Sequence, residues 1–254
     1  MYKQGLMVAA LVLAAATTAA YADNGLTQLG ANAAATKKAA AKEGWQGSAS
    51  LGYVSTTGNT NTRSLNAQLL AAYKSGNWAD VLSFEALQAS SNGVTTAESY
   101  DLNGQSDYSL TSTDYLFGLA DYQRNTFAGF QRRTSEIVGY GRNLVTTATQ
   151  QLNVEFGVGA RQTRFTTDTS QGEFVQRLAG SYLWKFTDKS NFSQTLSIEH
   201  GPDNTFTQSV TALTTNVAGN FALSVSYTVN HNSTVLPTFK NTDTIFSVSL
   251  VNTF

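Results

Sequence analysis

Two histidines are the residues of this chain best suited to acid–base catalysis. His200 lies close to Asp203 in the sequence, and His231 is followed by Asn232 and Ser233. A barrel hydrolase needs a nucleophile, a histidine base and an orienting acid or amide within hydrogen-bond reach of one another. Serine and asparagine are so frequent here that such neighbours arise by chance, and the sequence favours solvated histidines in loops. A membrane-embedded hydrolase or lipid-modifying enzyme stays as an alternative.

Cofactor and metal chemistry have little support in the sequence. Cysteine is absent, which excludes disulfides and thiolate metal sites. The carboxylates of Asp101, Asp107 and Glu155 are spread over different predicted strands, with Asp101 and Asp107 on one and Glu155 on another, and lack compact ligand spacing. Gly157 and Gly159 precede no predicted helix, so they relieve crowding in a strand rather than hold a phosphate. We therefore expect no cofactor, no metal site and no catalytic residues.

The composition indicates a protein that faces two different solvents. Charged residues are 13% of the chain, well below the roughly 25% of soluble domains, yet hydrophobic residues are only 41%. Serine, threonine, asparagine, glutamine and glycine fill the difference, a mix typical of a wall between lipid and water. The net charge of −1 supplies no basic field, so we expect no nucleic-acid partner.

Apolar residues recur at every second position from Trp45 onward. Val154 and Phe156, for example, alternate with Asn153 and Glu155. A period of two predicts β-strands with one apolar and one polar face, and open sheet edges cannot exist in lipid. The sequence therefore predicts an all-β fold: a transmembrane antiparallel up-and-down β-barrel of about twelve strands, of the bacterial outer-membrane type.

The chain begins like a secreted protein. Lys3 precedes an apolar run over 6–16, and Ala22 before Asp23 completes a small-residue cleavage site. These features predict a signal peptide over 1–22 that is removed from the mature protein. A membrane anchor is the alternative, although the run is shorter than the ~20 residues that a spanning helix needs.

A distinct segment separates the signal peptide from the strands. Residues 23–43 are rich in alanine and lysine and carry no large apolar face. This composition predicts a periplasmic lead, and a plug for the barrel is the alternative. The alternating pattern then continues to the end of the chain, so the barrel is expected over 44–254.

The connections between the predicted strands alternate in length. Short links such as Ser75–Asn77 are followed by longer ones such as Ser90–Ala97, Gln123–Arg133 and Gln162–Gly172. Outer-membrane barrels have short periplasmic turns and longer outer loops. We therefore expect both chain termini in the periplasm of a Gram-negative bacterium.

Aromatic residues gather at the predicted periplasmic ends of the strands. Tryptophan and tyrosine prefer membrane–water boundaries because their rings are apolar with one polar edge. A general preference of aromatic residues for strands does not explain why they share one end. One predicted strand carries Tyr115, Phe117 and Leu119 on the face expected to meet lipid. The predicted aromatic girdle consists of Trp45, Trp78, Trp184, Tyr73, Tyr108 and Tyr115.

The last predicted strand ends on an aromatic residue. Phe246, Val248, Leu250 and Phe254 lie at even spacing and predict one apolar face. A closing strand with a terminal aromatic residue is typical of the assembly signal of outer-membrane barrels. We therefore expect the outer-membrane assembly machinery as a partner, besides outer-membrane lipid and lipopolysaccharide, and a monomer in the membrane.

The lumen is the place where function is expected. Charges of both signs at the polar strand positions either create a transverse field that orients polar solutes or pair with one another. A barrel of about twelve strands lies between the side-chain-filled and the open porin sizes, and we favour a packed or narrow interior over an open one. The predicted lumen charges are Glu85, Asp101, Asp107, Glu155, Arg161, Arg177, Lys185 and Glu199.

Three predictions of function stay open. The leading one is a narrow passive pore or a structural envelope component without enzymatic activity. The second is the hydrolase or lipid-modifying enzyme that would use a histidine. The third is surface binding through the outer loops, where Arg124, Arg132 and Arg133 are suited to contact lipopolysaccharide phosphates; a solvated loop without a ligand is the plainer interpretation.

The chain also resembles a known family. Residues 44–52 (GWQGSASLG) followed by 57–66 (TGNTNTRSLN) are similar to the opening hairpin of the salt-induced outer-membrane proteins, the YdiY-like group. Segments 119–130 and 177–184 carry further similarity. The resemblance covers about 44–254 and implies an outer-membrane β-barrel of unassigned biochemical function, with a link to salt or osmotic stress suggested by the family's name. It implies no catalytic residues.

Overall fold

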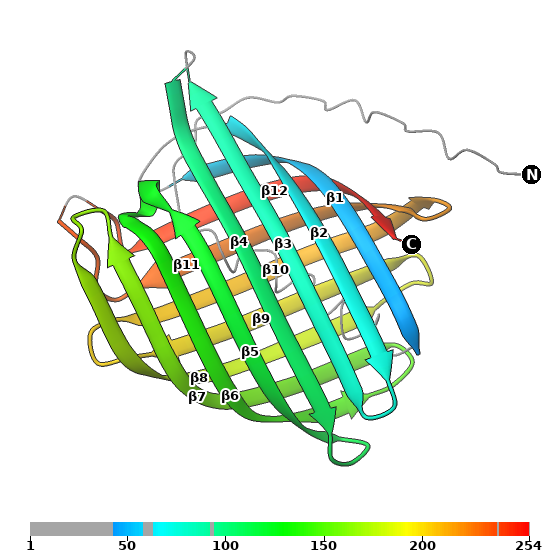
Figure 1. Cartoon of the computed structure of the whole chain (residues 1–254). Coiled ribbons are helices and arrows are strands. Elements are labelled where there is room, and N and C mark those ends of the chain that lie inside the picture. Colours follow the sequence, from blue (N-terminus) through cyan, green and yellow to red (C-terminus); the bar gives the residue numbers. More distant parts are fainter. Residues whose placement is uncertain (1–42, 58–62, 92–93, 238, 254) are drawn as a thin grey trace, which may run out of the picture.

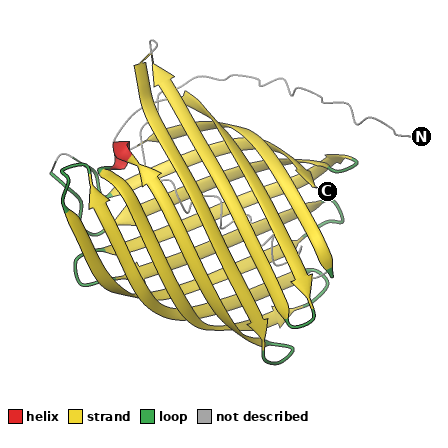
Figure 2. Ribbon diagram, in the orientation of Figure 1, coloured by secondary structure: helices red, strands yellow, loops and turns green. Residues whose placement is uncertain are grey.

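The computed structural model describes residues 43–57, 63–91, 94–237 and 239–253. These residues form twelve β-strands and one short 3-10 helix, η1 (Thr126–Ala128), and Figure 1 and Figure 2 show the strands tilted around a single barrel. No helix in these ranges is long and apolar enough to cross a membrane. The strands are β1 (Gly44–Thr57), β2 (Arg63–Ser75), β3 (Trp78–Ser91), β4 (Val94–Ser109), β5 (Asp114–Asn125), β6 (Phe130–Thr146), β7 (Gln150–Phe165), β8 (Ser170–Lys185), β9 (Ser190–His200), β10 (Thr205–Ala218), β11 (Phe221–Asn232) and β12 (Thr242–Thr253).

The barrel is closed by the pairing of its first strand with its last. β1 pairs in antiparallel fashion with β2 on one side and with β12 on the other, from Ser48↔Thr253 to Thr57↔Thr244. Every other strand pairs with its neighbours in the sequence. Closure leaves no strand edge with unpaired N–H and C=O groups, which is the condition for spanning lipid. The predicted antiparallel up-and-down barrel of twelve strands is confirmed.

One long connection, between β11 and β12, distinguishes the two ends of the barrel, since the described β5–β6, β7–β8 and β9–β10 connections have four residues each, as many as the β4–β5 turn. At the end where β1 begins and β12 ends, here called the terminal end, the turns are short, such as Gly76–Asn77 between β2 and β3. At the opposite end, the loop end, the β11–β12 connection spans 233–241. The longer connection predicted over Ser90–Ala97 is wrong, because β3 and β4 continue to pair as far as Ser91↔Val94 after a register shift at Ala89. Where water rather than lipid surrounds a hairpin, its strands can pair through the backbone without an apolar face, so the apolar pattern does not reveal them.

Side chains alternate between the two faces of the barrel wall. In β7, Glu155 is 6% exposed and the next residue, Phe156, is 55% exposed, since successive strand residues point to opposite faces. The outer face carries many large exposed apolar and aromatic residues, namely Leu, Val, Phe, Tyr and Trp, as expected of a surface that meets lipid. The inner face carries most of the buried polar and charged residues.

Aromatic pairs lie on the outer face at the terminal end. The rings of Trp45 and Tyr73 on β1 and β2 have centroids 4.8 Å apart, and those of Trp78 and Tyr108 on β3 and β4 are 4.9 Å apart. Trp184 is exposed near the end of β8. These rings share the outer face at one end of the barrel, the arrangement that amphipathic aromatic side chains adopt at membrane–water boundaries.

The faces of β5 are the reverse of those predicted. Tyr115 is 5% exposed, and Phe117 and Leu119 are also buried, so all three point into the lumen. The predicted place of Tyr115 in the outer aromatic girdle is therefore wrong. β5 is apolar on both faces, with Leu116 and Tyr122 outside, so the period of two does not reveal which face meets lipid.

Candidate functional site in the barrel lumen

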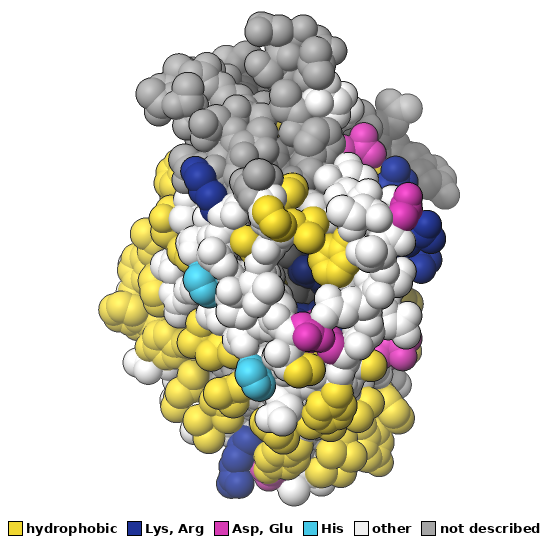
Figure 3. Space-filling view, turned by 90° about the vertical axis from the view of Figure 1, so that its left-hand side faces the viewer, with side chains coloured by type: hydrophobic (Ala, Val, Ile, Leu, Met, Phe, Trp, Pro, Cys, Tyr) yellow, Lys and Arg dark blue, Asp and Glu magenta, His cyan; other side chains and the backbone are white. Residues whose placement is uncertain are grey.

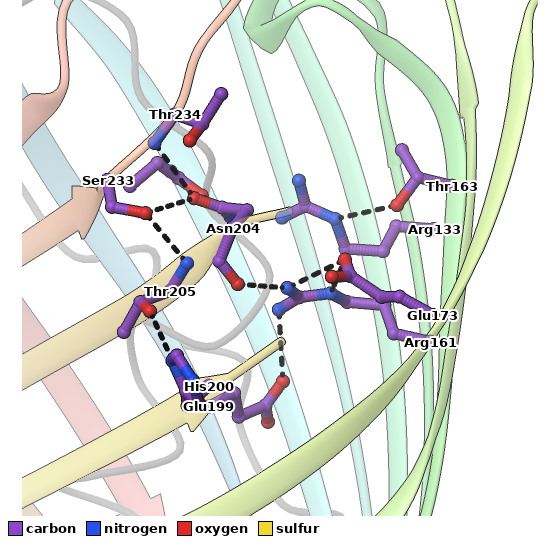
Figure 4. Close-up of polar contacts among 11 residues, drawn as sticks. Arg133, Arg161, Thr163, Glu173, Glu199, His200, Asn204, Thr205, Ser233 and Thr234 are labelled. Carbon is purple, nitrogen blue, oxygen red and sulfur yellow. Dashed lines mark hydrogen bonds and ion pairs between the residues drawn. The ribbon is translucent and has the colours of Figure 1, made fainter. Parts of the chain in front are cut away.

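Five charged residues on β7, β8 and β9 form an ion-pair network on the inner wall. Arg161 donates to Glu173 Oε1 from Nε (3.0 Å) and Nη2 (2.9 Å), and its Nη1 lies 3.5 Å from Glu199 Oε2 (Figure 4). Arg177 Nε lies 3.9 Å from Glu199 Oε1, and its Nη1 lies 2.9 Å from Glu155 Oε2. These five residues, whose charges alternate in sign, are here called the lumen network.

Strand register brings the lumen network together. Arg161 and Glu173 are direct partners across the β7–β8 hairpin, and Arg177 and Glu199 are direct partners between β8 and β9. The side chains of Arg161, Glu173 and Glu199 are almost completely shielded from solvent. Buried charges are costly unless each is paired and hydrogen-bonded. The members of the network therefore depend on one another.

Arg161 also connects the wall to the loop end of the barrel. Its Nη2 donates to the carbonyl oxygen of Asn204, 2.9 Å away in the β9–β10 connection. The side chain of Asn204 accepts from the Thr234 N–H at 3.1 Å and from the Ser233 hydroxyl at 3.3 Å (Figure 4). Asn204 also donates to Asn232 Oδ1 at 2.8 Å. One arginine thus holds the β9–β10 connection, which in turn holds the β11–β12 connection.

Tyr115 links β5 to the lumen network across β6. Its hydroxyl donates to Glu155 Oε1 at 2.9 Å. Tyr115, Gly141 and Glu155 lie in one register row of β5, β6 and β7, and a Cβ on Gly141 would lie 2.2 Å from Tyr115 Cζ. Only glycine permits so close an approach. The bare backbone at Gly141 is therefore what lets the tyrosine ring lie flat on the wall and reach the carboxylate.

The rest of the lumen wall divides into an acidic and a neutral part. Glu85 on β3 and Asp101 on β4 are register partners, and both are buried inside the barrel. On β5, Asp121 accepts from the Asn103 side-chain amide at 3.2 Å. The described inward residues of β10 and β11 are uncharged. The described lumen wall is thus charged along β3 to β9 and uncharged along β10 and β11, and β12 adds one buried carboxylate, Asp243.

The loop end of the lumen is narrowed by the β11–β12 connection. Leu236 and Phe239 reach Gly129 in the β5–β6 connection, where a Cβ would lie 3.3 Å from Leu236 Cδ1 and 3.5 Å from Phe239 Cζ. These two connections belong to opposite sides of the barrel. A cavity of about 40 Å³ lies between them, with Arg133 in its lining. Figure 3 looks onto this end and shows a hollow with a basic side chain inside.

The terminal end of the lumen holds a larger cavity of about 270 Å³. Its lining includes Asp107, Tyr115 and Asn153. Lys185 lies at this rim and donates to the carbonyl oxygen of Ala148, 3.0 Å away in the β6–β7 turn. The predicted lumen charges therefore fall into three groups: the lumen network, the acidic pair Glu85 and Asp101, and Asp107 with Lys185 near the terminal end.

Both histidines point outward at the loop end. His200 Nδ1 lies 2.7 Å from Thr205 Oγ1, and His231 Nδ1 lies 2.8 Å from Thr242 Oγ1. Within the described ranges neither ring has a serine or a carboxylate as its hydrogen-bond partner. The same ranges contain no group of three or more His, Asp or Glu side chains that could hold a metal ion.

The C-terminal strand presents one apolar face to the outside. Phe246 is exposed and shares the outward face of β12 with Val248 and Leu250, and the serines between them are buried. Predictions that fall outside the described residues are the signal peptide over 1–22 with Ala22 and Asp23, the part of the periplasmic lead over 23–42, and the terminal Phe254.

Sequence reasoning misses Glu173, the main partner of Arg161. The sequence predicts a long connection over Gln162–Gly172, which separates the two residues, whereas β7 and β8 are joined only by 166–169. The available signal is Asp168, a turn-forming residue with φ of 61°. A hairpin centred on this turn places Glu173 directly opposite Arg161.

Arg133 is a second residue of the inner wall that the sequence places in a loop. β6 begins at Phe130, so the predicted loop over Gln123–Arg133 shrinks to 126–129. Arg133 is buried inside, with its guanidinium 4.4 Å above the Phe130 ring and its Nε 3.4 Å from Thr163 Oγ1. The three arginines predicted to share one outer loop therefore do not share one face.

Sequence comparison identifies relatives of this chain. Residues 49–254 match a family described as protein of unknown function, DUF481. The chain is 32% identical over 195 residues to the uncharacterized protein YdiY of Escherichia coli (strain K12), an alignment that covers 77% of each protein.

Solved structures share the fold at low sequence identity. The NanC porin has 10% identity and a TM-score of 0.56, over 80% of this chain and 98% of that one. The KdgM porin has 13% identity and a TM-score of 0.51, over 82% and 99%. The translocator domain of the autotransporter NalP from Neisseria meningitidis has 13% identity and a TM-score of 0.54, over 88% and 95%. Together with the closed barrel, these matches establish that the chain is a YdiY-like member of the DUF481 family with the fold of a bacterial outer-membrane β-barrel.

Proposed function

We propose that this protein is a narrow passive pore for small polar solutes and has no catalytic activity. The observation that carries the proposal is the lumen wall, which is charged from β3 to β9 and uncharged on the described inward positions of β10 and β11. A pore with charge on one side and neutral polar groups on the other has a transverse field that orients dipolar solutes. A purely structural role in the envelope would not require this asymmetry.

The restricted width supports small solutes rather than large ones. Twelve strands enclose less space than the sixteen to eighteen of large porins, and the β11–β12 connection narrows the loop end further through Leu236 and Phe239. The lumen network occupies part of the remaining space. NanC and KdgM, which share the fold, are porins by name.

Planar-bilayer recording tests the pore directly. Refolded protein should give small, stable single-channel currents in concentrated KCl. The double variant Leu236→Ala, Phe239→Ala frees the narrowing connection and should increase the current per channel. Leu223→Ala, on the outer face of β11, is the matched control and should leave the current unchanged. No current from well-folded wild type and double variant would remove the pore and leave the structural envelope role.

We also propose that both termini face the periplasm. The support is the difference between the short turns of the terminal end and the β11–β12 connection of the loop end. The chain has no cysteine, so single cysteines can report orientation without background. A membrane-impermeant maleimide should label Asp203→Cys in intact cells and should reach Asn77→Cys only after the outer membrane is opened. The reverse pattern would invert the orientation.

Assembly and expression complete the proposal. The outward apolar face of β12 would be presented to the outer-membrane assembly machinery, and the folded barrel would be a monomer among outer-membrane lipids. Deletion of Phe254 should reduce the amount of heat-modifiable, membrane-inserted protein, and normal insertion would contradict this role. The salt-related name of the resembling family predicts more protein after an osmotic upshift, which quantitative immunoblotting would measure.

A further inference from the structure

Three neighbouring strands end in arginine on the outer face of the barrel at the loop end. Arg124 is the last outward residue of β5, Arg132 the first outward arginine of β6, and Arg164 lies near the end of β7. All three are exposed. Arg132 and Arg164 are direct register partners, and Arg124 precedes the Asn125↔Phe130 pair on the other side of β6. We call these three residues the exterior arginine row.

Little negative charge balances this row within the protein. Arg164 Nη2 donates to Asp168 Oδ1 at 3.1 Å, and Gln131 shares the same carboxylate oxygen at 3.2 Å. Among the described residues, Asp168 is the one carboxylate in ion-pair contact with any of the three arginines. Like charges directly opposite on a sheet are destabilising. Two guanidiniums in direct register with a single carboxylate beside them therefore form a site that an anion from outside the chain would stabilise.

The order of side chains along β5 indicates the depth of this anion. From the terminal end the outward residues are Leu116, Gly118, Ala120, Tyr122 and Arg124. Apolar residues that meet acyl chains are followed by a tyrosine, which prefers the membrane boundary, and then by the arginine. The row thus begins where lipid chains give way to headgroups.

The row is confined to one side of the barrel. On the other side, the outward residues at the loop ends of β9 to β12 are His200, Thr205, His231 and Thr242, and the two histidines are satisfied by the neighbouring threonine hydroxyls. A general attraction to anionic membrane surfaces would not need the arginines on adjacent strands. Their clustering favours a ligand with closely spaced phosphates.

We infer that the exterior arginine row binds the phosphate groups of lipopolysaccharide in the outer leaflet. Guanidinium groups bind phosphate oxygens in bidentate fashion, with shorter and stronger hydrogen bonds than neutral donors make. Arg132 and Arg164, direct partners across the β6–β7 ladder, would clamp one phosphate, and Arg124 a second. The inference rests on the proposed orientation, which puts the loop end outside, and not on conduction through the lumen.

Binding of purified lipopolysaccharide to detergent-solubilised protein tests the row. The triple variant Arg124→Gln, Arg132→Gln, Arg164→Gln should bind it at least about tenfold more weakly than wild type, because charge-assisted contacts are lost. Arg142→Gln is the matched control, since Arg142 is outward and exposed but lies on β6 near the terminal end. It should bind like wild type.

Two further arms separate the sources of the effect. Dephosphorylated lipopolysaccharide should bind wild type as weakly as the triple variant binds the intact lipid, and vesicles of anionic phospholipid should not compete. Undiminished binding by the triple variant, or equal loss in Arg142→Gln, would overturn the inference. Full competition by phospholipid would replace it with a general anion surface. The binding assay does not depend on conduction, so failure of the pore proposal leaves it intact. If the pore conducts, the single-channel current of the triple variant should match that of wild type.

Discussion

The inner and outer faces of β5, β6 and β7 use the same residue types for different purposes. Arg161 faces inward with a side chain that is 2% exposed and is held by two carboxylates, whereas Arg164 faces outward, is 48% exposed and pairs with one carboxylate, Asp168, among the described residues. Gly141 lies under the ring of Tyr115, whereas Gly118 faces outward with nothing within 4 Å of where its Cβ would be.

This difference shows that the role of an arginine or a glycine in the barrel wall depends on whether its side chain position is buried, and not on the residue type alone. An inward charge cannot meet water freely, so it is useful only when its partners are built into neighbouring strands. An outward charge at the loop end keeps its solvent and stays available to a ligand from the membrane. Arg161 and Gly141 on the inner face have Arg164 and Gly118 as outer counterparts of the same type, and substitutions at both positions of a pair measure the contrast.

The largest difference is expected between the two arginines. Arg161→Met should lower the free energy of unfolding by about 3–5 kcal/mol, because it leaves the buried Glu173 without its cation and leaves Glu199 with Arg177 alone. Arg164→Met should change it by less than about 1 kcal/mol. Urea unfolding from lipid vesicles, followed by tryptophan fluorescence, measures both.

A compensated variant checks the reason for that loss. Adding Glu173→Gln and Glu199→Gln to Arg161→Met removes the unpaired charges and should restore part of the stability. Equal, small losses in Arg161→Met and Arg164→Met would mean that water in the lumen screens the network, and the contrast between the faces would disappear.

The two glycines should differ by a smaller amount. Gly141→Ala puts a Cβ 2.2 Å from Tyr115 Cζ and should cost about 1–3 kcal/mol through displacement of the ring. Gly118→Ala meets no atom and should be neutral or slightly stabilising, since glycine weakens a strand. The same unfolding assay applies. In a Tyr115→Ala background the cost of Gly141→Ala should vanish, and its persistence would show that the tyrosine is not the cause.

The two tyrosines extend the comparison to a single hydrogen bond. Tyr115→Phe removes the donor to Glu155 and should cost about 1–2 kcal/mol, because the bond is to a charged group while Arg177 remains on the carboxylate. Tyr122→Phe on the outer face should change stability by less than about 0.5 kcal/mol. Similar values for both variants would mean that water replaces the inner hydroxyl.

The smallest effect concerns pH at the outer face. Hydrogen bonds from Arg164 and Gln131 hold the pKa of Asp168 below its ordinary value of 3.8. A lowered pKa adds stability that is present above pH 3.8 and is lost as the pH falls through the folded-state pKa. NMR titration of Asp168 should therefore give a lower pKa in wild type than in Arg164→Met. An unchanged pKa in the variant would show that the contact is not formed in solution.

The sequence predicts the barrel well because its outer face has a simple physical requirement. Lipid demands an apolar residue at every second position, and Val154 and Phe156 satisfy that rule visibly. The chemistry of the inner face is harder to predict, because it depends on register across strands. The Arg161–Glu173 pair can be predicted only once the β7–β8 turn is known to be short. The sequence does not show the length of this turn, because the strands continue beyond the lipid with polar residues on both faces.

β5 shows a second limit of prediction. Its two faces are equally apolar by residue type, so alternation alone cannot orient it. What orients it is the neighbouring strand, where Gly139 and Gly141 leave space inside the barrel for Phe117 and Tyr115. Such space is a property of the pair of strands and is not visible in either one alone.

The contact between Tyr115 and Gly141 also restricts how the family can change over time. A side chain at position 141 meets the ring at position 115, so a mutation at 141 that comes before a smaller residue at 115 is expected to cost stability. The two positions should therefore covary among relatives, with glycine at 141 wherever 115 is aromatic. At this site we therefore expect a smaller residue at position 115 to be substituted before a side chain is introduced at position 141.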